Sequence, residues 1–379
     1  MSYFSAVQFL TAGGVKQFLW NGDAPQVCAQ PYLQALAEGD ISGHTAWTKL
    51  GYALMPATTE TDIYSYGGTV PVQPLMTAAA LRRVVSAHAD DHGVVLRGDA
   101  TGDTVHADAD SSETLLHDAD VDFQAGGGTV VTAGCCVLLD PHGTTPEWGY
   151  VTAVSQYNLT IANGFSSGGT AASRHYAVLD YAAHPGAQAV LLNYLDGAYV
   201  THREIVVTNG AQVNGVLTVN ADIFRINSFR VIATGSAGKP SGALSLGNNA
   251  TPPTIIYGYI TAGYTRGRSS LYTVPASKTL YITAAQMSFG SNAANKAEYC
   301  RLYIRAAQYT TEDGTVAFRT NVAPGVVVWY PYSEVVVANS VVQLSFEAPI
   351  KILPSVSVKV SGAASGVGVA TVGLRGWLE

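Results

Sequence analysis

The sequence is poor in charge and in long apolar runs. Only 12% of its 379 residues are Asp, Glu, Lys or Arg, about half the share in an average soluble domain. No apolar run approaches the roughly 18–20 residues that a membrane helix needs. The net charge of −7 argues against a surface that binds nucleic acid. We therefore expect neither nucleic acid nor a membrane among the partners of this chain.

Cysteine is also scarce. The four cysteines, Cys28, Cys135, Cys136 and Cys300, do not have the spacing of a zinc site. Adjacent Cys135 and Cys136 would point to opposite faces of a strand. We expect reduced thiols that pack as small apolar groups.

The composition is that of a packed chain with many turns. Apolar residues make up 47% of it and glycine occupies 39 positions, which excludes general disorder. The best helix signal is Pro31 to Glu38, where proline suits the first helical position and Gly39 ends the helix. A second short helix could span Met76 to Arg83. The rest is typical of short strands separated by Gly, Asn, Asp and Pro, which predicts an all-β protein of antiparallel sandwiches or barrels.

One hairpin is predicted from its turn. Val190 to Leu195 and Ala198 to Val207 flank Asp196-Gly197 and alternate like strands. An Asp-Gly pair supplies the positive φ angles of a tight type I′ turn. We therefore expect a two-residue turn at this point.

A shift in composition marks an inserted segment. Between His88 and His184 lie seven of the nine histidines and no lysine, and ten acidic residues crowd the stretch from Asp90 to Asp122. We interpret the acidic run as a hydrated face, with a docking surface for a basic partner or a site that collects divalent ions as the alternatives. The segment is predicted to be a module inserted at a loop tip, where insertions are best tolerated.

The predicted organisation has four parts. They are an N-terminal arm with a short helix (1–60), a first β-sandwich (61–92 and 187–248), an inserted small β-barrel (93–186) and a jelly-roll-like C-terminal β-sandwich (249–379).

No pattern in the sequence specifies a reacting centre. The cluster from His88 to His92 lacks the Glu of an HExxH helix and the spacing of an EF-hand loop, so we interpret it as a solvated turn leading into the insert. Asp120 and Asp122 could act as the two carboxylates of a glycosidase, but such i, i+2 pairs arise by chance in acidic strands. No GxSxG nucleophile elbow or phosphate-binding loop occurs. The sequence predicts no enzyme, no metal and no cofactor.

Aromatic side chains are the candidate contact residues. Those of the first 60 residues favour either an arm that orders on a neighbouring subunit or one that folds back on its own sandwich. The candidate docking residues of this arm are Phe4, Phe9, Phe18, Trp20, Tyr32 and Trp47. A second set suits sheet packing and subunit interfaces or, alternatively, stacking on a glycan. Its members are Tyr257, Tyr259, Tyr264, Trp329, Tyr330 and Tyr332.

Several short sequence segments (called phrases below) resemble those of a family of tailed-bacteriophage virion structural proteins. The opening of that family is similar to Ile41 to Tyr52, and a later strand of the family ends like Tyr194-Leu-Asp196. Further similar phrases are Thr61 to Tyr64, Gly67 to Thr69, Val84 to Ser86, Arg203 to Val207 with an outward Glu204, Phe224 to Phe229, Gly235 to Gly238, Tyr272 to Thr283, Phe346 to Lys351 and Gly376 to Leu378. Residues 94–181 resemble instead a small β-barrel module that recurs in phage structural chains.

This resemblance implies a structural component of a tailed-phage virion, assembled in the bacterial cytoplasm and repeated by symmetry, with a trimer expected. The expected place is the capsid surface, as a head-decoration or head-fibre protein. The alternative is a tail or collar component, or a receptor-binding fibre or spike that recognises host glycans. Expected partners are other copies of this chain and virion proteins such as major capsid, collar or tail subunits.

Overall fold

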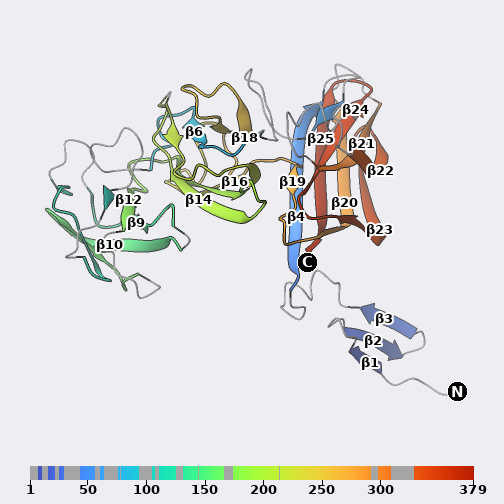
Figure 1. The fold of residues 1–379 in the computed structure, drawn as a ribbon, viewed down its shortest axis with the longest axis horizontal. Helices are drawn as coiled ribbons and strands as arrows, with labels where there is room; N and C mark the ends of the chain where they lie inside the picture. The colour runs from blue at the N-terminus through green and yellow to red at the C-terminus, as the bar shows by residue number, and fades with distance from the viewer. Residues whose placement is uncertain are drawn as a thin grey trace. The chain divides into compact units, whose positions relative to one another are not determined.

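The structure is entirely β in the part of the chain that it describes. This computed structural model describes residues 7–10, 16–21, 25–29, 43–55, 60–63, 76, 78–93, 105–106, 111–124, 131–143, 145–165, 174–212, 214–291, 298–308 and 328–379. Every regular element in these ranges is a strand (Figure 1), so the all-β prediction is confirmed. Within them, no helix has the length and apolar character needed to cross a membrane.

The two predicted helices have different outcomes. Pro31 to Glu38 lies outside the described residues. The helix over Met76 to Arg83 is wrong in its described residues, which are irregular until Arg83 begins a strand.

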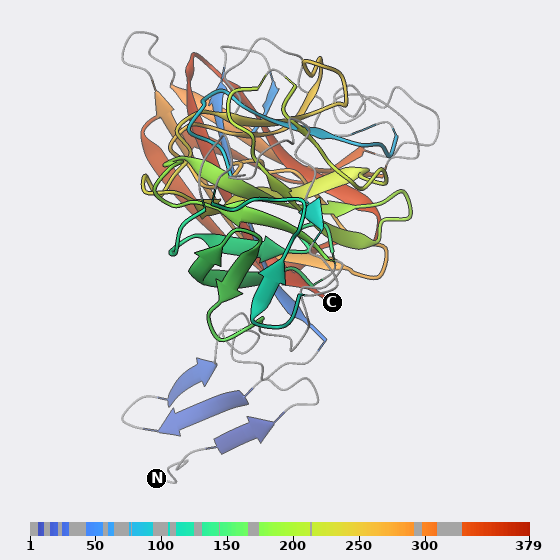
Figure 2. The same ribbon diagram turned by 90° about the vertical axis from the view of Figure 1, so that its left-hand side faces the viewer.

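The chain divides into two compact units. The first contains residues 1–63, 274–306 and 329–379, and the second contains residues 64–273 and 307–328. At the start of the first unit, three strands form a small antiparallel sheet of their own, as both Figure 1 and Figure 2 show. They are β1 (Val7–Leu10), β2 (Lys16–Asn21) and β3 (Pro25–Ala29).

Two larger sheets build the rest of the first unit. One has the order β23-β20-β25-β4 and the other contains β24-β21-β22, with β5 beside β24. The strands of the first sheet are β4 (Thr45–Met55), β20 (Leu280–Ser291), β23 (Ser340–Ile352) and β25 (Gly368–Leu378). Those of the second are β5 (Thr61–Asp62), β21 (Tyr299–Gln308), β22 (Val328–Val337) and β24 (Val356–Ala364).

β4 belongs to this unit's sheet and not to an arm. It pairs antiparallel with β25 along its whole length, from Thr45 opposite Leu378 to Met55 opposite Gly368. The predicted arm residue Trp47 is consequently buried, with 6% of its surface exposed. The arm predicted over residues 1–60 is therefore wrong for residues 45–55, because their partner strand lies at the opposite end of the chain.

Buried ion pairs hold β5 against β24. Lys359 Nζ lies 2.6 Å from Asp62 Oδ2, and both side chains are more than nine-tenths buried. Arg305 pairs with Glu60, whose carboxylate also accepts a hydrogen bond from Ser361. Separating such a pair would leave an uncompensated buried charge. Residues 60–63 thus belong to the first unit, which corrects the predicted start of the first sandwich at residue 61.

The second unit contains a sandwich of two sheets, with orders β14-β13-β16 and β15-β6-β17-β18. The first sheet consists of β13 (Ala187–Leu195), β14 (Thr201–Val207) and β16 (Arg225–Thr234). The second consists of β6 (Arg83–Ser86), β15 (Val216–Leu217), β17 (Leu244–Gly247) and β18 (Ile256–Ile260). Because β18 pairs with β17, the boundary predicted at 248/249 is wrong, and the unit runs on through the short strand β19 (Tyr272–Thr273).

The predicted insert contains a six-stranded sheet of order β7-β12-β9-β10-β11-β8. Its strands are β7 (Val105–His106), β8 (Leu115–His117), β9 (Cys136–Leu139), β10 (Glu147–Ser155), β11 (Asn158–Ile161) and β12 (His175–Leu179). A register shift between Val151 and Ala153 divides β10, whose first half pairs with β9 and second half with β11. The described ladder ends at β7 and β8, and its closure into a barrel stays a prediction.

The insert is a third layer of the second unit rather than a module at a loop tip. Alternate residues of β9 face opposite ways: Val137 and Leu139 pack in the insert's own core, while Leu138 packs against the sandwich. The sandwich residues that meet this layer are Ala189, Leu191, Ile205 and Val207. The opposite face of the same sheet packs in the sandwich core through Val190, Leu192, Tyr194 and Val206. The sheet β14-β13-β16 is therefore buried on both faces.

The same layering places the two adjacent cysteines. Cys135 is buried in the insert's core and Cys136 packs against the layer shared with the sandwich. Their positions on opposite faces confirm the prediction. Burial raises the pKa of both thiols, which therefore stay protonated near neutral pH.

A buried carboxylate joins the two chain segments that enter and leave the insert, near residues 91 and 187; we call this place the neck. Asp91, which is fully buried, accepts hydrogen bonds from Ser86 Oγ (2.6 Å) and from the backbone N–H groups of Ala187 (2.7 Å), Ser241 (2.8 Å) and Gly242 (2.9 Å). These donors come from before the insert, after the insert and the loop that precedes β17. The interpretation of this region as a solvated turn is wrong at Asp91, whose role is structural.

The predicted hairpin forms with a different turn. β13 and β14 pair from Ala189 opposite Val207 to Leu195 opposite Thr201. The loop between them is five residues long, and its positive φ angle of 62° falls on Tyr199. Asp196 closes this loop by accepting hydrogen bonds from the N–H groups of Ala198 and Val200, each at 2.9 Å. The two-residue type I′ turn is therefore wrong, because a side-chain cap stabilises a longer loop.

Deleting residues 94–181 tests the layered packing. The deletion uncovers the apolar face of Ala189, Leu191, Ile205 and Val207, so we expect the shortened chain to aggregate. Adding Leu191→Thr and Ile205→Thr should restore solubility, since threonine suits a solvent-facing strand. Light scattering and circular dichroism measure both outcomes. A soluble, folded deletion variant without the threonines would contradict two-sided burial.

Asp91→Asn tests the neck. The substitution places an amide group among four hydrogen-bond donors, and we expect it to lower the free energy of unfolding by on the order of 3 kcal/mol. Urea denaturation measures the loss. The matched control is Asp90→Asn, whose carboxylate is 44% exposed and whose replacement should cost less than about 0.5 kcal/mol. Equal effects of the two substitutions would contradict the stabilising role of the Asp91 carboxylate.

The neck should also make stability depend on pH. The rings of His92 and His184 lie 4.5 Å apart, and burial lowers the pKa of each below the ordinary 6.5. Asp180 and Asp90 face His184 and oppose this shift. Below about pH 6.5 the unfolded chain binds more protons than the folded one, so the free energy of unfolding should fall as the pH drops from 7.5 to 5.5. In urea titrations across this range, His92→Gln should flatten the fall, whereas His88→Gln at an exposed position should not.

Candidate functional site

The predicted arm residues do not form one docking surface within the described chain. Phe4 and Tyr32 lie outside the described residues, and Trp47 is buried in the first unit. Phe9 lies in β1, and Phe18 and Trp20 lie in β2; their side chains are not among those described. Docking through these strands stays a prediction.

The second aromatic set is spread over both units. In the second unit, Tyr257 packs against the sandwich core with the Arg82 guanidinium 4.7 Å from its ring centroid, and Tyr259 is half-buried on the same strand. Tyr264 is exposed, but Arg268 stands 3.7 Å over its ring. In the first unit, Tyr332 donates to Glu334 and meets the Phe346 ring edge-on. The contacts of Tyr257 and Tyr332 are those of sheet packing, whereas Tyr264 lies in a turn, and glycan stacking by this set stays a prediction.

Trp329 and Tyr330 lie in β22, and the described residues do not include their side chains. Stacking of a glycan on either ring stays a prediction.

An exposed face with aliphatic side chains occurs on the sheet β23-β20-β25-β4, where Gln286, Ser288 and Thr371 lie between them. Its outer face is defined here by Leu50, Tyr52, Leu54, Val341 and Val369. Residues that alternate with them along β4, such as Ala53 and Met55, are buried. Leu54 is 65% exposed, Val341 57% and Leu50 45%.

The strand register gathers these side chains on one side of the sheet. Leu54 lies opposite Val369, and Tyr52 lies opposite Thr371, which pairs through Ser288 with Val341. β4 is the last strand of this sheet, and among the described strands it has β25 as its one ladder partner there. An exposed row of aliphatic side chains on the outermost described strand of a sheet is a feature through which sheets associate.

A separate polar pocket lies in the second unit, where the insert meets the β13–β14 hairpin. Its volume is about 390 Å³. The residues that line it include His142 from the insert, Tyr194, His202 and Arg203 from the hairpin, and Asn220 and Asp222 from the loop before β16.

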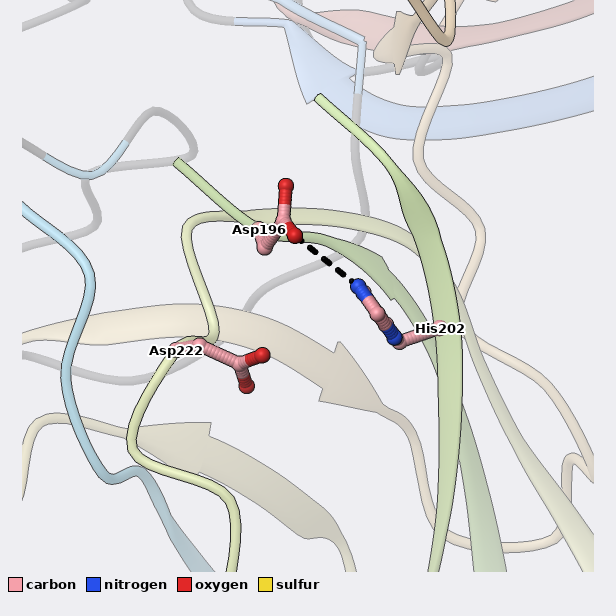
Figure 3. A group of neighbouring side chains, drawn as sticks. All are labelled: Asp196, His202 and Asp222. Atoms are coloured by element: carbon pink, nitrogen blue, oxygen red, sulfur yellow. Dashed lines mark hydrogen bonds and ion pairs between the residues drawn. The ribbon is translucent and has the colours of Figure 1, made fainter. Parts of the chain in front are cut away.

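Two residues that line this pocket, His202 and Asp222, and the neighbouring Asp196 point their side chains toward one another (Figure 3). Asp196 Oδ2 lies 2.9 Å from His202 Nε2. Tyr194, directly opposite His202 in the ladder, stacks its ring on the imidazole at 5.5 Å and donates its hydroxyl to Asp222 Oδ1 at 3.0 Å. The three groups therefore come from the hairpin loop, from β14 and from the loop before β16.

The surroundings of Asp196 and Tyr194 shift the pKa of each group in a defined direction. Burial alone would raise the pKa of Asp196, but the Val200 N–H and the His202 ring hold it below its ordinary value. Burial and the Asp222 carboxylate raise the pKa of Tyr194, so its hydroxyl stays protonated and continues to donate.

Glu204 fixes the loop that carries Asp222. It is fully buried, and its carboxylate accepts hydrogen bonds from the N–H groups of Val219 (2.7 Å) and Asn220 (3.2 Å) and from Asn220 Nδ2 (2.9 Å). The expectation of an outward Glu204 is wrong, because the loop before β16 covers this end of β14.

Sequence reasoning missed the pocket, since its residues come from three separate segments. The segment Tyr194-Leu-Asp196 was the one sequence feature that drew attention to this region. No sequence pattern marks His142 or Asp222, because their positions depend on the packing of the insert and of the loop before β16.

No family model matches the chain, and no curated protein matches it significantly. Among solved structures, a chain of infectious bursal disease virus strain Gx is 11% identical, with 88% of this chain and 76% of that chain covered and a TM-score of 0.16. A chain from the triple jelly-roll turret of an archaeal virus is 9% identical, with 100% and 89% covered and a TM-score of 0.13. The Cry1Da core of Bacillus thuringiensis is 10% identical, with 80% and 60% covered and a TM-score of 0.13. Scores this low establish no common fold, so function is argued from this chain's own residues.

Proposed function

We propose that this chain is a structural subunit of a virus particle that acts by binding to copies of itself and to other virion proteins. The observation that carries the proposal is the outer face of the sheet β23-β20-β25-β4. It presents aliphatic side chains, with Leu54 65% exposed, and β4 is the outermost described strand of this sheet. An all-β chain with such a face is suited to repeated association.

The finer proposal is a head-decoration or head-fibre protein of a tailed bacteriophage, in a trimer. It is supported by the resemblance of the phrases from Ile41 to Tyr52 and from Phe346 to Lys351. Residues 45–52 of the first segment lie in β4 and the second segment lies in β23, both in the sheet that carries the outer face. The proposed role needs no reacting centre, and we propose no enzymatic activity.

Burial of apolar area supplies the binding free energy in this proposal. Each Leu or Val buried in an interface contributes about 1.5–3 kcal/mol, and many identical contacts in one particle raise the total avidity. A decoration protein therefore needs only modest affinity at each contact.

Leu54→Asp tests the interface. If the outer face joins subunits, a buried aspartate there should weaken self-association about 10- to 100-fold, while the melting temperature of the isolated chain stays within a few degrees. Mass photometry across a concentration series measures the association. The matched control is Val219→Asp, an exposed aliphatic position (54%, against 65% for Leu54) in the second unit. A wild-type chain that stays monomeric at micromolar concentration would overturn the proposal.

Quantitative mass spectrometry of purified particles tests the finer assignment. Many copies per particle are expected for a decoration protein, whereas a few copies would identify a tail, collar or receptor-binding component instead.

A further inference from the structure

We propose that Asp196, His202 and Asp222 form a binding site for a divalent transition-metal ion such as Zn²⁺. This site lies in the second unit and is independent of the outer face of the sheet β23-β20-β25-β4. Its three ligands would come from three different elements: the hairpin loop, β14 and the loop before β16.

The spacing of the candidate ligand atoms fits an ion with short bonds. Zn²⁺ binds nitrogen and oxygen at about 2.0–2.2 Å, so two adjacent ligands of one ion lie roughly 3 Å apart. Asp196 Oδ2 and His202 Nε2 already stand 2.9 Å apart, and all three ligand atoms lie within 4.8 Å of one another. Only Asp222, an exposed residue on a loop, has to move inward to complete the set.

Neighbouring groups hold each carboxylate in place and leave one oxygen for an ion. The Ala198 and Val200 N–H groups both bind Asp196 Oδ1, so Oδ2 stays directed at His202. Tyr194 donates to Asp222 Oδ1, and its ring stacks on the His202 imidazole. Such second contacts to ligands are typical of metal sites, where they orient the ligands.

The donor set selects the class of ion. One imidazole nitrogen and two carboxylate oxygens suit Zn²⁺, whereas Ca²⁺ and Mg²⁺ are bound through oxygen. Three protein ligands leave a fourth position of a tetrahedral ion open. His202 and Asp222 both line the 390 Å³ pocket, so that position is accessible to water or to a group of a partner.

The pocket wall carries an independent sign of a ligand. His142 contributes an Nδ1 atom that is buried and has no hydrogen-bond partner among the described residues, although Glu204 Oε1 lies 3.4 Å away. Unpaired buried polar atoms are costly and rare in native structures. A water molecule bound to an ion in this pocket would give that nitrogen a partner.

Zn²⁺ binding to the full-length chain tests the proposal. After treatment with EDTA and removal of the chelator, isothermal titration with ZnCl₂ should show one tight site per chain, and elemental analysis after gel filtration should retain about one zinc. Asp222→Asn preserves an oxygen acceptor for Tyr194, so the variant should fold, but it should bind Zn²⁺ at least tenfold more weakly. His202→Gln should have the same effect.

The matched control is Asp90→Asn. It removes the carboxylate of another neighbouring His–Asp pair, His88 and Asp90, at 3.6 Å on an exposed segment, and should leave the tight site intact. Asp196 is left unchanged because it closes the hairpin loop. The proposal is overturned if Zn²⁺ binds no more tightly than Ca²⁺, or if Asp222→Asn and His202→Gln both leave the affinity unchanged while circular dichroism shows them folded.

Discussion

Burial of the sheet β14-β13-β16 on both faces is the constraint on which the second unit depends. One face carries Val190, Leu192 and Tyr194 into the sandwich core, and the other carries Leu191 and Ile205 against the insert. Because the side chains of a strand alternate, a shift of one residue would exchange the two sets. Each set is apolar, however, so the pattern alone does not define the register. Polar groups at the two ends of the sheet define the register instead. They are Asp91, where the chain enters the insert, and Glu204, beside the loop before β16.

The polar pocket is a consequence of the same layering. At the far end of β13 and β14 the apolar rows stop, and the three layers present polar groups to one another. Glu204 is buried there and accepts three hydrogen bonds, from the N–H groups of Val219 and Asn220 and from Asn220 Nδ2. A buried carboxylate is tolerated only when it accepts hydrogen bonds. Because moving the loop before β16 would remove the donors of Glu204, these hydrogen bonds keep the loop that carries Asp222 in place. The proposed ion would use an arrangement that folding has already assembled.

The first unit differs from the second in that its long sheet β23-β20-β25-β4 is buried on one face, not on both. β4 brings residues from the start of the chain to the edge of a sheet whose other strands come from its end. Its inward residues fill the core, while Leu50 and Leu54 are left in solvent. An apolar outward row on a long edge strand is unfavourable for an isolated molecule and favourable for one that associates. This contrast is why the proposed function rests on the first unit and the proposed metal site on the second.

The sequence by itself determined the class of the fold, the hairpin of β13 and β14, and the opposite placement of Cys135 and Cys136. These properties depend on short-range periodicity and turn residues, which neighbouring positions encode. Tertiary structure alone decided the partner of β4, the burial of Asp91 and Glu204, and the meeting of His142 with Asp222. Such features depend on pairing between segments far apart in the chain, where several partners satisfy the same local pattern. Only the packing of whole layers, which requires every buried polar group to find a donor or acceptor, selects among them.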